Sequence, residues 1–104
     1  GTRSALIGDY RVFATLAPST VGSNRLRLQI QDLGGEPVDL KTWPTVSIRT
    51  AGFDLGSRAL VSDDVGTRET TVILPKPGRW NVQVSLRVDE FTNPVIDLPF
   101  IVAP

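Results

Sequence analysis

Apolar and polar residues alternate along much of this chain. In residues 25–31 every second position is apolar, and the same alternation runs over the longer stretch 79–88. Because successive side chains of a β-strand point to opposite faces of the sheet, this alternation predicts two strands that each bury one face. The residues expected to point inward are Leu26, Leu28, Ile30, Trp80, Val82, Val84, Leu86 and Val88. The arginines expected on outward faces are Arg25, Arg27, Arg79 and Arg87.

Shorter or less regular alternation predicts further strands. These strands cover residues 9–17, 45–50, 58–61, 67–74 and 95–102, and clusters rich in Pro, Gly, Asn and Asp separate them. Eight prolines and nine glycines make a long helix implausible anywhere. About seven short strands with one polar face each predict an all-β fold, an immunoglobulin-like Greek-key β-sandwich of antiparallel strands.

The length of 104 residues is that of a single domain. We therefore expect one β-sandwich over residues 1–104, with residues 1–8 as a flexible N-terminal segment. No apolar run approaches the roughly 20 residues that span a bilayer, so we expect no membrane span in this chain. The start of the chain also lacks a signal-peptide pattern, which is compatible with a domain excised from a longer protein.

The composition excludes several kinds of chemistry. The chain has no Cys, His or Met, and its 11 basic and 11 acidic residues are scattered. Without His or Cys, a Ser-His-Asp or Cys-His triad cannot form, and sulfur and imidazole metal ligands are also missing. Scattered charge gives no basic footprint for nucleic acid. We expect no enzymatic activity, no cofactor, no metal and no nucleic-acid partner.

Three aspartates are candidates for a calcium site. Asp54, Asp63 and Asp64 lie in predicted loops that would meet at one end of the sandwich, where their carboxylates would supply oxygen ligands. Aspartate is also common in turns because its side chain bonds to its own backbone. We favour the turn interpretation, and we predict no specific metal site.

The two tryptophans differ in their sequence context. Trp80 begins the longest alternating stretch on its apolar side, which predicts a large aromatic residue in the core. Trp43 precedes Pro44 in an irregular stretch. It either closes one end of the sandwich or is exposed as an anchor for a protein partner, because Trp is enriched at interface hot spots. Trp43 is therefore the candidate partner surface.

Three motifs in order carry a resemblance to a known family. They are Pro18-x-x-x-Gly22-x-Asn24 before a strand, Asp32-x-x-Gly35-x-Pro37-Val38 in a turn, and Leu74-Pro75-x-x-Gly78-x-Trp80-x-Val82-x-Val84 in a hairpin. Together they resemble the YtkA-like and copper-resistance-D-like extracytoplasmic domains of bacteria. The resemblance covers residues 8–102.

The resemblance implies an immunoglobulin-like domain attached to a multi-span copper-transport or copper-resistance protein. Such a domain would lie in the periplasm or on the outer face of the cytoplasmic membrane. Related domains hold copper through His, an N-terminal amine and Met. This chain has no His or Met, so no copper ligand carries over. We expect a non-catalytic accessory domain that contacts a protein partner or its attached membrane domain. The alternative is an adhesion or spacer module of a secreted or cell-surface protein.

Overall fold

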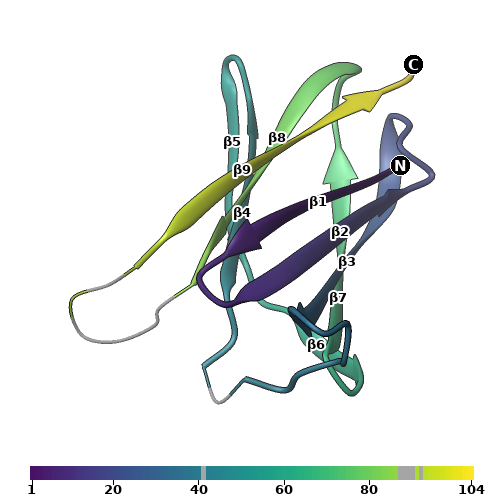
Figure 1. The fold of residues 1–104 in the computed structure, drawn as a ribbon. Helices are drawn as coiled ribbons and strands as arrows, with labels where there is room; N and C mark the ends of the chain where they lie inside the picture. The colour runs from purple at the N-terminus through teal and green to yellow at the C-terminus, as the bar shows by residue number, and fades with distance from the viewer. Residues whose placement is uncertain (41, 87–90, 92) are drawn as a thin grey trace.

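Two antiparallel sheets make up the fold (Figure 1). The computed structural model describes residues 1–40, 42–86, 91 and 93–104. One sheet has the order β1-β2-β3-β7-β6 and the other has the order β5-β4-β8-β9. The strands of the described residues are β1 (Thr2–Ile7), β2 (Tyr10–Ala17), β3 (Gly22–Asp32), β4 (Thr45–Thr50), β5 (Phe53–Arg58), β6 (Val61–Asp64), β7 (Thr67–Leu74), β8 (Gly78–Ser85) and β9 (Val95–Val102). The predicted all-β architecture of antiparallel strands is confirmed.

The core lies between the two sheets and is built by the alternating residues. Leu26, Leu28 and Ile30 of β3 are fully buried, and so is Trp80 of β8. Burying an aliphatic side chain of this size contributes about 1.5–3 kcal/mol to folding, so these positions supply much of the stability. The inward assignment is confirmed for these residues and for Val82, Val84 and Leu86. Val88 and Arg87 lie outside the described residues.

The N-terminal segment differs from the expectation. Residues 1–8 were predicted to be flexible, but Thr2–Ile7 forms β1 and pairs with β2 along its whole length. The two strands are joined by Gly8 and Asp9, with Ile7 paired to Tyr10. Gly8 has a φ of 57°, which a two-residue hairpin turn needs at its first position. The hairpin turn at Gly8 therefore pairs β1 with β2, and the weak alternation of residues 2–7 did not predict this strand.

The predicted strand over residues 58–61 is also wrong. Arg58 ends β5 in one sheet and Val61 begins β6 in the other, so these residues are the crossover between the sheets. The sandwich has more strands than the seven predicted because β1, β5 and β6 were not recognised as separate elements.

The two ends of the sandwich are formed by different turns and segments. Gly1 and Pro104 lie at the same end, together with the turns that follow β2, β4 and β7 (Figure 1); we call this the terminal end. The β1–β2 turn, residues 33–40 and 42–44, and the β6–β7 turn lie at the opposite end. We call this the Trp43 end. Among the described residues there is no helix with the length and apolar character needed to cross a membrane.

Candidate functional site

A buried asparagine organises the first motif at the terminal end. Asn24 is 2 % exposed, and its Oδ1 accepts hydrogen bonds from the backbone N–H groups of Ser19 (2.7 Å) and Thr20 (3.3 Å). Its Nδ2 donates to the carbonyl oxygens of Thr20 (2.7 Å) and Gly22 (3.0 Å). One side chain thus provides partners for the backbone of the whole turn. The asparagine of this motif is a structural residue.

The third motif anchors Trp80. Gly78 takes a φ of 116° at the start of β8, and the indole Nε1–H of Trp80 donates to the carbonyl oxygen of Lys76 at 2.9 Å. Lys76 in turn reaches the carbonyl oxygen of Ala51 at 2.8 Å and lies over the ring of Phe53. Trp80 is therefore buried with its one polar group satisfied, as a buried indole requires. Its prediction as a core residue is confirmed.

The second motif forms a compact turn at the Trp43 end. Asp32 Oδ1 accepts the backbone N–H groups of Gly34 (2.9 Å) and Glu36 (3.0 Å). The chain then runs back along β3, where the N–H of Val38 donates to the carbonyl oxygen of Ile30 at 3.0 Å. Asp32 therefore stabilises the turn through these hydrogen bonds to its backbone, as its sequence context indicates.

Close packing at Gly66 holds the next part of this segment. The N–H of Gly66 donates to Asp39 Oδ1 at 2.8 Å, and its carbonyl oxygen accepts from the N–H of Ile30 at 2.8 Å. A Cβ at position 66 would lie 2.9 Å from the backbone N of Val38, and the φ of 71° is in the left-handed region. The chain that leads to Trp43 is thus fastened to β3 and β7 by backbone contacts.

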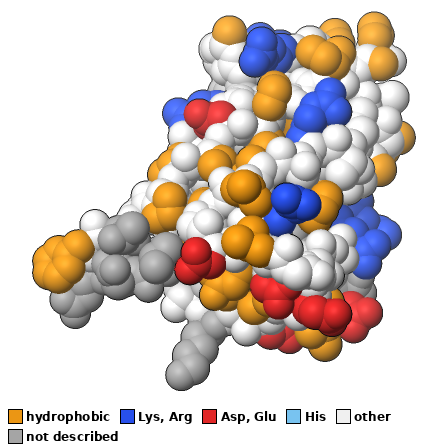
Figure 2. Space-filling model, in the orientation of Figure 1, with side chains coloured by type: hydrophobic (Ala, Val, Ile, Leu, Met, Phe, Trp, Pro, Cys, Tyr) orange, Lys and Arg blue, Asp and Glu red, His pale blue; other side chains and the backbone are white. Residues whose placement is uncertain are grey.

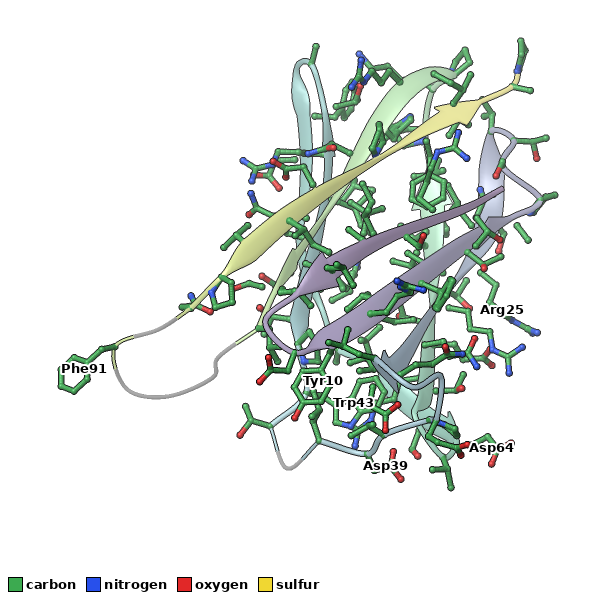
Figure 3. All side chains as sticks on the ribbon, viewed as in Figure 1. Tyr10, Arg25, Asp39, Trp43, Asp64 and Phe91 are labelled. Carbon is green, nitrogen blue, oxygen red and sulfur yellow. The ribbon has the colours of Figure 1, made fainter. Side chains whose placement is uncertain are left out.

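Trp43 lies where this segment passes between the two sheets. Its ring is partly buried and packs against the core, and Figure 3 shows it at the Trp43 end. The guanidinium carbon of Arg68 lies 4.4 Å from the centre of the Trp43 ring, within the range of a cation–π interaction. The indole Nε1 is buried and has no acceptor in the described part of the structure. Trp43 therefore closes one end of the sandwich, and its N–H is unsatisfied there.

Two arginines point inward next to this closure. Arg68 is opposite Leu28 in the β3–β7 register, and Arg58 is opposite Val46 in the β4–β5 register. Leu28 and Val46 are fully buried, and residues directly opposite each other in an antiparallel pair share a face. Both side chains therefore leave their strands on the inner side of the sheets, and the guanidinium group of Arg68 lies over Trp43. The Nε atoms of both are buried without a hydrogen-bond partner in the described structure.

In the described part of the structure, the carboxylates at this end form no ion pair with the inward arginines. The only ion pair recorded among the described residues joins Arg25 to Glu69, at 3.8 Å on the outer face of β3 and β7. Acidic side chains gather along the lower edge of the molecule in Figure 2, the end that carries Asp39 and Asp64 in Figure 3. Asp39 and Asp64 each accept a backbone N–H, from Gly66 and Val65 respectively. The site therefore combines inward cations with an acidic rim.

The structure separates the three calcium candidates. Asp54 is the second residue of β5, at the terminal end, and its Oδ1 accepts the N–H of Gly56 at 2.8 Å, while Asp64 lies at the Trp43 end. The side chain of Asp63 lies outside the described part. Among the described residues no group of three potential metal-ligating side chains is found. The expectation that these loops would meet is wrong, because the strand between Asp54 and Asp64 runs the length of the sandwich.

Other expectations concern the outer surface. The structure confirms that Arg25, Arg27 and Arg79 are exposed on outward faces.

Phe91 is 93 % exposed in the connection between β8 and β9, far from Trp43 (Figure 3). No pattern in the sequence distinguishes Phe91 from a core residue. Arg58 and Arg68 were also missed, because only the strand register shows that they point inward.

Fold and site define a class: an all-β domain of two packed antiparallel sheets whose Trp43 end holds an arginine–tryptophan stack with unsatisfied donors. Comparison of the chain with protein-family models, with curated proteins and with solved structures finds no match. The functional argument therefore depends on this site and on the motif resemblance.

Proposed function

We propose that this chain is a non-catalytic, extracytoplasmic accessory domain that binds a protein partner through its Trp43 end. The resemblance of its three motifs supplies the wider context, a copper-transport or copper-resistance membrane protein. In this proposal the domain contributes contacts to the assembly and holds no copper ion of its own.

One observation carries the proposal: the Trp43 end leaves buried hydrogen-bond donors without acceptors. The Trp43 indole N–H and the Nε groups of Arg58 and Arg68 have no partner in the described structure. An unsatisfied buried donor costs about 1–3 kcal/mol, so such a group calls for an acceptor from outside the described fold, which a binding partner, an ordered water or an ion can supply. Trp and Arg are also the residues most enriched at binding hot spots.

The position of the termini supports the same assignment. Gly1 and Pro104 lie together at the terminal end, and Gly1 and Ala103 both hydrogen-bond to Ser19. Any segment joined to either terminus would leave the molecule from that end. The Trp43 end then faces away from the attachment and stays accessible to a partner. A spacer in a linear array is better served by termini at opposite ends.

The proposal can be tested by site-specific photocrosslinking in the native host. A crosslinking amino acid replaces exposed Thr42 at the Trp43 end, and a matched variant carries it at exposed Pro77 in the turn before β8. We expect the Thr42 variant to crosslink to a copper-transport membrane protein or to a protein that delivers copper to it. The Pro77 variant should give none of these products.

Two outcomes would contradict the proposal. One is crosslinking of both variants to the same proteins, which would mean that the Trp43 end has no special role. The other is a set of partners that are all unrelated to copper handling. A parallel copper titration of chain acetylated at Gly1 should show no stoichiometric binding.

A further inference from the structure

The fold separates charges that are scattered in the sequence. At the Trp43 end, the turns, the strand ends and the crossing segment carry the carboxylates of Asp9, Asp32, Glu36, Asp39 and Asp64. Figure 2 shows acidic side chains along the lower edge of the molecule and basic side chains among apolar ones at the top, which is the terminal end. The 11 residues of β3 separate the two ends by roughly 30 Å, several times the Debye length of about 8 Å at physiological ionic strength. The acidic end therefore does not cancel the charge that a ligand meets at the terminal end, although the net charge of the chain is zero.

Three arginines give the terminal end a basic character. Arg3, Arg49 and Arg79 are exposed, and each lies within two residues of a turn or a chain end there. None of the three belongs to the ion pair recorded among the described residues. Arg49 and Arg79 line the same open hollow on the outer face of β4 and β8. Asp54 is the one carboxylate that the described structure places equally close to this end, so the balance of charge there is positive.

Apolar side chains are exposed at the same end. They are Val21 in the turn after β2, Phe53 at the start of β5, and Ile73 and Ile101, each one residue before the end of its strand. Ile101 is 67 % exposed and is opposite Arg79 in the β8–β9 register, and Lys76 lies over the ring of Phe53. The terminal end thus presents apolar side chains from four separate segments next to cationic groups.

We propose that the terminal end binds the surface of a bilayer that contains anionic lipids. In this arrangement the arginines contact the headgroups, and the exposed apolar side chains enter the boundary between the headgroups and the acyl chains. An anionic leaflet attracts each nearby Lys or Arg, and burial of apolar side chains at that boundary adds to the attraction. A protein partner would need a continuous complementary patch, whereas a bilayer accommodates side chains that project from separate turns.

Binding in this way also orients the domain. An anionic surface repels the carboxylates of the Trp43 end, so that end faces away from the bilayer. Any segment joined to Gly1 or Pro104 would then leave the domain on the bilayer side. The inference goes beyond the proposed function, because it concerns the opposite end and depends neither on copper nor on a protein partner.

Co-flotation of the whole chain with lipid vesicles tests the inference. One set of vesicles contains equal parts of phosphatidylglycerol and phosphatidylcholine, and the matched set contains phosphatidylcholine alone. We expect binding to the anionic set to be at least about tenfold stronger, since each arginine near such a surface contributes about fivefold. Raising the ionic strength to about 1 M, where the Debye length is about 3 Å, should remove most of this preference.

Variants connect the binding to the terminal end. Arg79→Gln should weaken binding to the anionic vesicles about fivefold, and Arg11→Gln, the same charge change near the Trp43 end, should leave it unchanged. Ile101→Ser should weaken binding several-fold because apolar burial is lost, and its matched control, Leu33→Ser at the Trp43 end, should have no effect. All four side chains are exposed, so these variants should keep the fold, which circular dichroism checks.

The inference is overturned if both vesicle sets bind the chain equally, if neither binds it at millimolar lipid, or if Arg11→Gln weakens binding as much as Arg79→Gln. Unchanged binding of Ile101→Ser would also overturn it, because the contact would then involve charge alone. Vesicle binding without crosslinking of the Trp43 end to copper-related proteins would refute the proposed function alone. The reverse pattern would refute this inference alone.

Discussion

Trp80 and Trp43 are the only two tryptophans of the chain. Trp80 lies near the start of β8, on the side of the terminal end, whereas Trp43 lies at the Trp43 end, and the hydrogen bonding of their N–H groups differs. Trp80 is fully buried and gives its N–H to the Lys76 carbonyl oxygen. Trp43 is partly buried, stacks with Arg68 and gives its N–H to no acceptor in the described structure. The comparison teaches that one tryptophan has its N–H satisfied within the fold, while the other keeps an N–H that the described structure leaves without an acceptor.

The largest expected effect comes from removing the core tryptophan. Trp80→Ala should lower the free energy of unfolding by about 3–5 kcal/mol, because it leaves a cavity between the sheets and an unpaired Lys76 carbonyl. Urea unfolding followed by circular dichroism measures this loss. Trp43→Ala is the matched control and should cost clearly less. An equal loss at both positions would mean that the two ends do not differ as described.

The next effect tests whether the segment that leads to Trp43 is held tightly against the sheets. Gly66→Ala should cost about 2–4 kcal/mol, because the new Cβ would meet the Ile30 and Val38 backbones at 2.9 Å in a left-handed conformation. Gly35→Ala is the matched control: Gly35 has a φ of 89° with nothing within 4 Å of the added Cβ. Thermal or urea unfolding of both variants should show the smaller loss for Gly35→Ala. Similar losses would indicate that the segment before Trp43 is not fixed to the sheets.

The smallest effect is the most informative about the unsatisfied donor. Trp43→Phe keeps an aromatic ring beneath Arg68 and removes an N–H that has no acceptor in the described structure. We expect a change in unfolding free energy below about 1 kcal/mol, since deletion of an unpaired polar group offsets the lost ring area. Trp80→Phe should cost more, because it strands the Lys76 carbonyl oxygen. A larger loss of unfolding free energy for Trp43→Phe than for Trp80→Phe would contradict this difference between the two tryptophans.

Alternation in the sequence predicted most of the sheets and the core. It worked well where one face of a strand is wholly buried, as in β3 and β8, because the period of two is then unbroken. It failed for β1, where residues 2–7 are exposed except for Ala5 and Ile7, so no apolar face is repeated. The Gly8-Asp9 pair was the available signal, as a two-residue hairpin turn.

The candidate site could be predicted only in part. Trp43 was identified from its irregular context, and the interpretation that it closes one end agrees with its packing against the core. Its role as a partner surface stays a prediction. Arg68 could not be assigned, since its inward direction follows from its pairing with Leu28, and pairing between distant strands is not visible in a single sequence. The same is true of Arg58, at the crossover that was mistaken for a strand.

The central claim is that the two tryptophan N–H groups differ in hydrogen bonding, and their signals report on both ends of the sandwich in one experiment. In a ¹H–¹⁵N correlation spectrum the Trp43→Phe variant assigns the two indole signals. The unaltered chain is then transferred into heavy water, and the loss of each signal by hydrogen exchange is followed with time. The account predicts that the Trp80 signal, whose N–H donates to the Lys76 carbonyl oxygen, persists longer than the Trp43 signal. Equal exchange rates, or slower exchange of the Trp43 signal, would contradict it.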